Sequence, residues 1–420
     1  MHAKKSYRPA ARYALLGALI FFSAAAPACN NRGPAPPTRA PDAAPAPLYL
    51  VRGLELARVN HKLPASVKLV EEQNGLIRPR SWEFRSERLD HPGLAALRER
   101  EKLDEVVAAG KDELDKMALL CDWVNSQWPL GTPHPYPPWD ANQILDLIRS
   151  GRTGGFCAQY AVVLAQCCLA LGWQARYLDV LTEDKKPGNG HFTVEVWSNQ
   201  YDQWVLLDPF YDCRFERDGR PLSALQVHQA LVSGEIDAVT MVVGKGKNAL
   251  AGVKFNQKAV MEKFFHLSAD PRNDHLSHPF NFWDRADTYL SWKDSATDGR
   301  PELYRDITDD PLDFDFPLNQ AQARLMASAA PDTLTCLVRT NMPEAETLEL
   351  KFEGGLWTRP PSPYLPGPSI LRAVLTPFHG SVIAFDWRLH PGANKLLLRA
   401  VNTAGITGPA TLLVVNYSGT

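Results

Sequence analysis

The sequence lacks a long apolar run, an excess of charge of either sign and any CxxC pair. Its 45 Lys and Arg residues nearly balance its 47 Asp and Glu residues, and a net charge of -2 gives no electrostatic reason to expect nucleic acid as a partner. The apolar stretch Tyr13–Ala26 is shorter than the about 20 residues that a membrane-spanning helix needs. Without a CxxC pair, a structural zinc site is not expected. The hydrophobic content of 45% is ordinary for a folded, soluble chain.

The first 29 residues have the layout of a signal peptide. Basic residues precede the apolar stretch Tyr13–Ala26, and small residues then lead to Ala28 and Cys29. This approach to a cysteine resembles the lipobox of bacterial lipoproteins, in which the cysteine becomes the new N-terminus and carries a lipid. The resemblance implies that Cys29 is lipidated and that this anchor holds the chain at a membrane of the bacterial cell envelope. Ordinary secretion with cleavage nearby is the alternative.

The segment after Cys29 predicts a spacer, and the cysteines beyond it cannot all be paired. Residues 30–47 are rich in Pro and Ala, cannot form a core and are expected to be a semi-extended linker. An oxidising compartment permits disulfides. If Cys29 carries a lipid and Cys157 is reactive, an odd number of cysteines remains. The chain has seven: Cys29, Cys121, Cys157, Cys167, Cys168, Cys213 and Cys336.

Residues 48–215 comprise an N-terminal region and a domain. The core of this domain, where the sequence pattern is clearest, is placed at about residues 111–215. Apolar residues at steps of three and four predict an amphipathic helix over Lys111–Asn125. Asp140 offers an N-cap to a second helix over Ala141–Arg149.

A glycine-rich loop then precedes a helix and three strands. Residues 150–156 contain three glycines and lead directly into an apolar helix that starts at Cys157 and ends at Gly172. A polar turn between the last two expected strands predicts an antiparallel hairpin. The three strands are expected at Gln174–Val180, His191–Trp197 and Trp204–Leu207.

The rest of the chain has two parts of different character. Residues 216–330 show little periodicity and stay unassigned. Within residues 331–420, Leu348, Leu350 and Phe352 alternate on one face, and turn signals separate further β-rich stretches. Short strands at this spacing predict a β-sandwich. The expected fold class is therefore α+β, with a C-terminal all-β sandwich-like domain.

Cys157 is the first candidate for chemistry. A cysteine is a nucleophile only as the thiolate, and a free thiol with a pKa near 8.5 is mostly protonated at neutral pH. The unpaired N–H groups at a helix N-terminus favour negative charge and lower such a pKa. Cys157 lies at this point, after a loop whose glycines let backbone and substrate approach closely. Cys167 and Cys168, inside the same helix, are expected to be buried apolar residues.

His191 and Asp208 supply the groups that such a thiol needs. If Trp197 pairs with Trp204 across the turn, Thr193 lies opposite Asp208 and His191 is the diagonal neighbour on the same face, roughly 7–8 Å away between backbones. A carboxylate in contact with the imidazole would hold its tautomer and stabilise the imidazolium that forms beside the thiolate. The sequence therefore predicts a triad of Cys157, His191 and Asp208.

At this point the sequence resembles the transglutaminase-like superfamily, which has a papain-like fold. About a quarter of the chain carries the resemblance, and the order Cys, His, Asp fits. In that family the cysteine attacks a carboxamide or peptide carbonyl and forms a thioester, the histidine carries the proton, and water or an amine accepts the acyl group. The matching stretches are Gly155–Ala161, Leu171–Arg176, Gly190–Trp197 and Trp204–Pro209.

The resemblance implies cysteine-dependent acyl transfer on the amide bonds of a protein or peptide substrate, by hydrolysis or transamidation, without a cofactor. The alternatives are an inactive binding or scaffold protein of the envelope and a structural protein with Cys157 in a disulfide. In the family, a small residue and then an aromatic residue often follow the histidine, whereas Phe192 and Thr193 follow it here. The residues that line the site are therefore not predicted. The backbone N–H of Cys157 is the default oxyanion donor. Upstream candidates for a second donor are Trp123, Trp128 and Gln143.

Two further clusters are expected to be structural. The spacing of one group of histidines and aspartates matches no common zinc pattern, so a surface loop and no metal site are expected. The acidic stretch Asp306–Asp315 lacks the glycine of a calcium loop and is expected to be a solvated turn. The group comprises His266, Asp270, Asp274, His275 and His278.

Overall fold

The computed structural model describes residues 47–52, 56, 60–78, 80, 82–186, 189–246, 256–279, 289–297, 306–361 and 381–419. The predicted signal peptide, Cys29 and almost all of the linker lie outside the described residues. The chain divides into two units, residues 1–43 and residues 44–420, and the description below concerns the second. Within the described ranges, no helix combines the length and the hydrophobicity that a membrane crossing requires.

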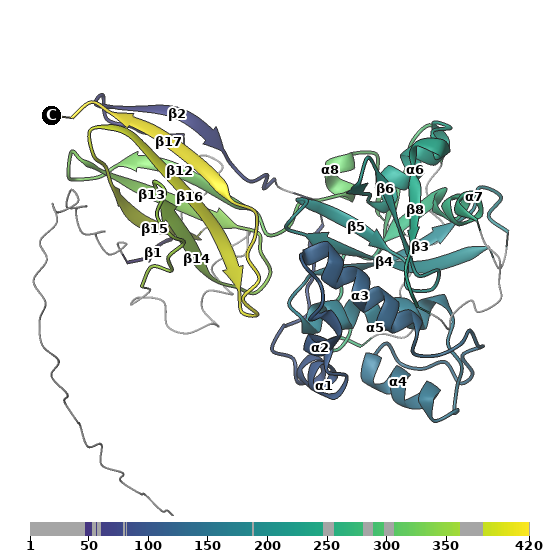
Figure 1. The fold of residues 1–420 in the computed structure, drawn as a ribbon. Helices are drawn as coiled ribbons and strands as arrows, with labels where there is room; N and C mark the ends of the chain where they lie inside the picture. The colour runs from purple at the N-terminus through teal and green to yellow at the C-terminus, as the bar shows by residue number, and fades with distance from the viewer. Residues whose placement is uncertain are drawn as a thin grey trace, which may run out of the picture. The chain divides into compact units, whose positions relative to one another are not determined.

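A six-stranded sheet, in the order β11-β10-β9-β3-β4-β5, organises the first part of the fold (Figure 1). Its neighbouring strands are antiparallel except for the parallel pair β10–β11. Three of its strands come from the region that showed no periodicity, because they are too short to produce a pattern. The strands are β3 (Ala175–Leu181), β4 (Gly190–Ser198), β5 (Gln203–Leu207), β9 (His266–Ala269), β10 (Leu290–Trp292) and β11 (Asp306–Thr308).

Five helices pack in one core with one face of this sheet. Phe192, Val194 and Val196 alternate along β4 and join this core, as the period of a strand requires. Helix α5 is buried along its length, and its first residue, Cys157, is the one that is not. The helices are α1 (Pro92–Arg100), α2 (Leu103–Val107), α3 (Glu113–Asn125), α4 (Ala141–Arg149) and α5 (Cys157–Ala170).

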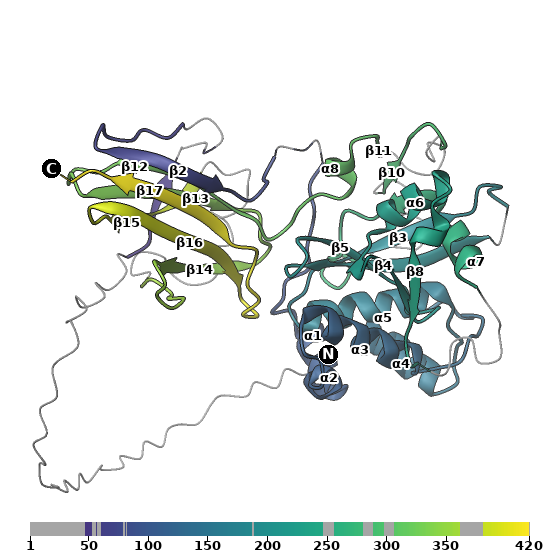
Figure 2. The same ribbon diagram turned by 45° about the horizontal axis from the view of Figure 1, so that its top comes forward.

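A second core covers the opposite face of the sheet. Leu178, Val180 and Leu206 point into it and meet residues of α6 and of a three-stranded sheet, β7-β6-β8. Figure 2 shows α6 and α7 on the side of the sheet away from α3 and α5. The sheet is therefore buried on both faces. The elements are β6 (Cys213–Arg217), β7 (Arg220–Pro221), α6 (Ala224–Val232), η2 (Ile236–Ala238), β8 (Thr240–Val243), α7 (Gln257–Met261), η3 (Glu262–Phe264) and α8 (Pro311–Phe314).

A buried arginine draws one end of the acidic stretch into this second core. The Arg176 side chain is fully buried; its Nε lies 2.7 Å from Oε2 of Glu195, and its Nη2 lies 2.9 Å from Oδ1 of Asp315. Its guanidinium also lies 4.4 Å from the ring centre of Trp204. A buried cation requires such partners. The expectation of a solvated turn over Asp306–Asp315 therefore fails at the end of the stretch, where Phe314 is buried and Asp315 is only partly exposed, whereas residues 306, 307, 309, 311 and 312 are exposed.

The expected surface loop of histidines is also largely buried. His266, His275 and Asp270 are buried, and His275 Nε2 lies 3.3 Å from Oδ2 of Asp270. The His275 ring packs against Trp139 and Tyr177, at 5.1 and 5.2 Å between ring centres. The polar composition predicted a surface position, but the contact between His275 and Asp270 and the aromatic packing accompany burial here.

The β-rich part is a pair of four-stranded sheets whose inner faces share one core. The expected α+β class with an all-β C-terminal part is confirmed. The expected boundaries differ from the strand pairing: β12 precedes residue 331, and β1 and β2 come from the N-terminal region because they pair with β15 and β17. The sheets are β1 (Tyr49–Arg52), β15 (Ser381–Arg388), β13 (Thr333–Thr340) and β12 (Ala321–Ala327), and β14 (Ala345–Phe352), β16 (Gly392–Asn402), β17 (Thr411–Tyr417) and β2 (Val67–Gln73).

Candidate active site

Cys157 is the first residue of helix α5, and its side chain is partly exposed. The preceding Phe156 has extended backbone angles, and its own N–H donates to the side-chain oxygen of Gln159 at 3.1 Å. The helix dipole therefore directs its positive end at the position of the Cys157 sulfur, as the sequence predicted. No other residue of α5 combines a nucleophilic side chain with exposure.

The glycines before Cys157 are required by close packing. A Cβ on Gly155 would lie 2.5 Å from Nε1 of Trp128 and 2.7 Å from the Cδ1 atom of Ile148. A Cβ on Gly154 would lie 2.6 Å from the carbonyl oxygen of Thr132. The loop is thus pressed against the segment that follows α3. Any side chain at these positions would displace the start of α5.

His191 and Asp208 meet as the strand register predicted. Trp197 pairs with Trp204 across the β4–β5 turn. The imidazole Nε2 of His191 lies 2.6 Å from Oδ2 of Asp208, and both side chains are buried. Because Nε2 is engaged by the carboxylate, Nδ1 is the ring nitrogen that remains for a thiol.

The turn after Asp208 fixes this carboxylate. Its Oδ1 accepts hydrogen bonds from the backbone N–H groups of Phe210 and Tyr211, at 3.1 and 3.0 Å. The rings of these two residues pack on the imidazole of His191, with ring centres 5.6 and 5.0 Å away. The ion pair is thus held in a low-dielectric environment, which strengthens it.

The charge state of His191 follows from these contacts. Burial opposes the imidazolium, but the negative charge of Asp208, its hydrogen bond to the ring and a further hydrogen bond with Cys157 outweigh burial. Together they raise the pKa of His191 to about 10. The histidine is therefore protonated at neutral pH, in contact with both the carboxylate and the sulfur. This arrangement suits a thiolate–imidazolium pair.

The other described cysteines have no such environment. Cys121, Cys167, Cys168, Cys213 and Cys336 are buried, and burial is the main cause that raises the pKa of each thiol. All six cysteines in the described residues are free thiols. The expectation that Cys167 and Cys168 are buried apolar residues is confirmed.

The three candidates for a second oxyanion donor differ in their surroundings. Gln143 is near the surface and donates to the N-cap carboxylate of Asp140 at 2.9 Å. Trp123 packs against the helical core. The indole Nε1 of Trp128 is buried next to Gly155 and finds no acceptor among the described residues. Trp128 is thus the candidate whose indole N–H lies beside the loop that carries Cys157.

Sequence reasoning did not identify the residues that support the triad from α3. Asn125 is buried, and its Nδ2 donates to the carbonyl oxygens of Pro209 and Phe210 at 3.0 and 3.3 Å. This amide anchors the turn between Asp208 and Tyr211 to the helix. An asparagine on the apolar face of a predicted helix was the available signal, because a buried amide must find partners.

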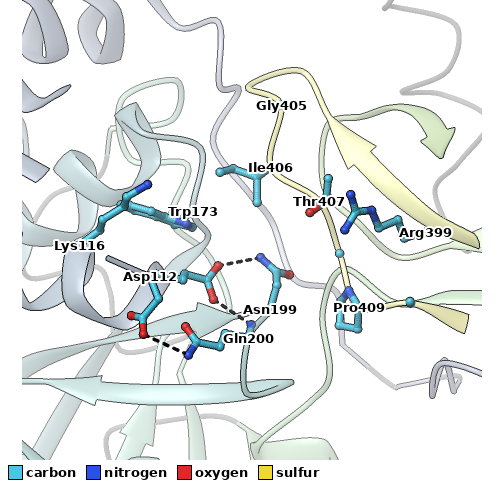
Figure 3. Close-up of a pocket in the computed structure, with 13 residues that line it drawn as sticks. Asp112, Lys116, Trp173, Asn199, Gln200, Arg399, Gly405, Ile406, Thr407 and Pro409 are labelled. Atoms are coloured by element: carbon cyan, nitrogen blue, oxygen red, sulfur yellow. Dashed lines mark hydrogen bonds between the residues drawn. The ribbon is translucent and has the colours of Figure 1, made fainter. Parts of the chain in front are cut away.

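A separate pocket of about 500 Å³ lies at the start of α3, the β4–β5 turn and the β16–β17 connection (Figure 3). In it, Glu113 accepts hydrogen bonds from Ser198, Asn199 and the backbone of Gln200. None of the three predicted triad residues lines this pocket.

A family model agrees with the motifs: residues 100–209 match that of the transglutaminase-like superfamily. Among solved structures 41 chains match, and one of them, a crystal structure of red sea bream transglutaminase, shares 14% sequence identity with a TM-score of 0.25, covering 76% of this chain and 72% of that chain. No curated protein matches. The matched segment contains Cys157, His191 and Asp208. Residues 100–209 of this chain are therefore a transglutaminase-like domain, as the motifs around these three residues predicted.

Proposed function

We propose that Cys157, His191 and Asp208 form a catalytic triad that transfers acyl groups from amide bonds through a thioester. The observation that carries this proposal is the 2.6 Å contact of His191 Nε2 with Asp208, made by a histidine that also hydrogen-bonds Cys157 at a helix N-terminus. Base, orienting carboxylate and nucleophile are then together in one place.

The reaction follows from these roles. The Cys157 thiolate attacks the carbonyl carbon of an amide, and its oxygen takes the negative charge. Protonated His191 gives its Nδ1 proton to the leaving nitrogen, the C–N bond breaks, and an amine or ammonia departs. Water or a second amine then attacks the thioester and passes a proton to His191, which restores the thiolate. Asp208 holds the ring orientation throughout.

The developing oxyanion requires donors that are fixed before the reaction. The backbone N–H of Cys157 is the first, because it lies in the open first turn of α5. The unpartnered Nε1–H of Trp128 is the second donor that we propose. Hydrolysis and transamidation use the same thioester, so the nature of the acceptor decides between them.

Limited alkylation of the full-length protein tests the triad. We would treat it with limiting iodoacetamide near pH 6 and locate labelled cysteines by peptide mass spectrometry, with His191→Ala alongside. Fast labelling of Cys157 ahead of the buried cysteines, slowed in the variant, supports the triad and justifies a screen with peptides and amines. Slow labelling of Cys157 that the variant leaves unchanged contradicts it and favours the binding or scaffold protein.

We also propose, from the N-terminal sequence, that Cys29 carries a lipid and anchors the chain in the bacterial cell envelope. Mass spectrometry of the mature N-terminus tests this. A diacylglyceryl mass on Cys29, absent in Cys29→Ser, supports the anchor, and an unmodified mature N-terminus at another residue contradicts it.

A further inference from the structure

Two carboxyl groups meet beside the turn that carries Asp208. Asp122 is on α3, and Asp212 is buried at the end of that turn. If Gly244 carried a Cβ, this atom would lie 2.2 Å from Oδ1 of Asp122 and 2.5 Å from both carboxyl oxygens of Asp212. The two carboxyl groups therefore converge on one point. Two adjacent carboxylates cannot both ionise in a buried position without a large cost.

The hydrogen bonds around this pair leave one oxygen facing the other carboxyl. Oδ2 of Asp212 accepts from the backbone N–H of Gly246 at 2.6 Å. Oδ1 of Asp212 is buried and accepts no hydrogen bond within the described part of the chain. A carboxyl oxygen in this position is satisfied when a proton is shared with a second carboxyl group.

The pair holds a short segment across the active-site turn. Besides the Gly246 contact, the N–H of Lys245 donates to Oδ1 of Asp122 at 3.1 Å, and the N–H of Gly244 donates to the carbonyl of Asp212 at 2.7 Å. A Cβ on Gly246 would lie 2.4 Å from the Oδ1 atom of Asn125, the residue that anchors the turn. Glycine at positions 244 and 246 thus allows the backbone to approach Asp122, Asp212 and Asn125 more closely than any residue with a side chain could.

We propose that Asp122 and Asp212 share one proton and so clamp residues 244–246 over the turn that carries Asp208, and that loss of this proton opens the clamp. With the clamp closed, the turn keeps Asp208 on His191. With the clamp open, the two carboxylates repel each other, and residues 244–246 no longer pack on the turn that carries Asp208. The regulatory consequence rests on the proposed function of the triad, whereas the shared proton does not.

The ionisable groups around Asp122 and Asp212 either act on this pair in the same direction or stay neutral. Burial, followed by the charge of Asp122, raises the pKa of Asp212 to about 7. Asp208, on the same turn, acts in the same direction. The neighbouring thiols of Cys121 on α3 and Cys213 on β6 have pKa values raised well above the ordinary value by burial, so they stay neutral. The covering segment contributes Lys245, whose side chain is exposed.

The sign of the pH effect follows from linkage. An acid whose pKa is higher in the closed state than in the open state favours closure fully below its ordinary pKa, 3.8 for this carboxyl, and loses this contribution as the pH rises through its pKa in the closed state, about 7. Opening should therefore become easier as the pH increases from about 4 to 7 and then level off.

Hydrogen exchange of the full-length protein tests the clamp. The backbone exchange of a peptide covering residues 240–246, corrected for the intrinsic pH dependence, should accelerate at least about tenfold between pH 5 and pH 7 in the wild type. Asp212→Asn should show no such change, because its amide accepts from Gly246, donates to Asp122 and does not ionise. Asparagine also tolerates the positive φ of 52° at this position. Asp218→Asn, at the exposed tip of the next turn with the same φ, is the matched control and should behave as the wild type.

Alkylation of Cys157 in the same samples tests the regulation. The rate for Asp212→Asn relative to the wild type should rise from about one at pH 5 to several-fold at pH 7.5. Identical exchange profiles in wild type and Asp212→Asn overturn the clamp. Different exchange with identical labelling at every pH overturns its link to the triad. If Cys157 labels slowly in every variant while the exchange difference persists, the proposed triad fails and the shared proton stands.

Discussion

The Nε2 atom of His191 lies 2.6 Å from Oδ2 of Asp208; His191 is on β4, and Asp208 directly follows β5, the strand joined to β4 by one short turn. Because the contact is built into a single hairpin, its geometry depends on the register of β4 and β5 and on the turn that follows Asp208. The nucleophile, by contrast, comes from a helix that packs against the sheet. Changes to the hairpin and changes to the helix start should therefore have separate effects.

Asp208→Asn tests the orienting carboxylate. The amide keeps the size of the side chain but removes the charge that stabilises the imidazolium, so the alkylation rate of Cys157 near pH 6 should fall at least about tenfold. Asp146→Asn, which alters an exposed ion pair with Arg100, should leave the rate unchanged. Equal rates in wild type and Asp208→Asn would show that the carboxylate does not support the thiolate.

The pH dependence of the same reaction tests the charge of His191. Because the pKa of His191 is raised to about 10, the imidazolium is present throughout pH 6 to 9, and Cys157 should label more slowly in His191→Ala than in the wild type at each pH in this range. The contacts that raise this pKa also contribute to the free energy of unfolding. Their contribution is complete below pH 6.5 and is lost as the pH rises through about 10. Urea denaturation at several pH values measures the effect on stability, and equal labelling rates in wild type and His191→Ala contradict the effect on Cys157.

Gly155→Ala tests the close approach before Cys157. The added Cβ would overlap the Trp128 indole and the Ile148 side chain, so we expect a loss of about 1–3 kcal/mol in the free energy of unfolding and slower labelling of Cys157. Gly190→Ala is the control, because its Cβ would meet no atom closer than 3.9 Å although it precedes His191. Equal stability of the two variants would be evidence against tight packing at Gly155.

Arg176→Ala tests the buried ion network under the sheet. Removing the cation leaves Glu195 buried without its partner, which should cost about 3–5 kcal/mol in the free energy of unfolding. Arg152→Ala, at an exposed arginine in the loop before Cys157, should cost little. Chemical denaturation of both variants gives the comparison, and a loss at Arg176 no larger than at Arg152 would contradict the network's importance.

Two shortened chains test the recruitment of the first strands into the sandwich. A chain that starts at residue 44 keeps β1 and β2 and should melt at the same temperature as the full chain. A chain that starts at residue 79 leaves β15 and β17 with bare edges, and it should aggregate on heating, as light scattering would detect. If both chains melt alike, the two strands contribute nothing to the sandwich.

Local patterns in the sequence predicted the elements around the site well. Helix α4 begins and ends where the N-cap Asp140 and the apolar spacing placed it, and the Trp197–Trp204 pair fixed the register that brings His191 to Asp208. These features depend on neighbours in the chain. A slip of the hairpin by one residue would turn its apolar residues to the opposite face, so the apolar pattern excludes that register.

Long-range pairings were beyond such reasoning. The strands β9, β10 and β11 have three or four residues each and find their places by pairing with distant strands. Asp315 lies in an acidic stretch, and its contact with the buried Arg176, which is distant in the sequence, explains why its side chain is only partly exposed. Asp212 likewise becomes notable through Asp122 and the glycines at 244 and 246, which lie far from it in the sequence.

The pairing of β2 with β17 has a consequence for synthesis. Gln73 on β2 is paired with Leu412 on β17, so β2 has no partner strand until about 340 further residues have been synthesised. The transglutaminase-like domain, encoded in between, can be completed earlier in translation. A product that terminates before residue 411 would therefore contain all three triad residues yet leave β2 without a partner, and its exposed edge would mark it for proteolysis.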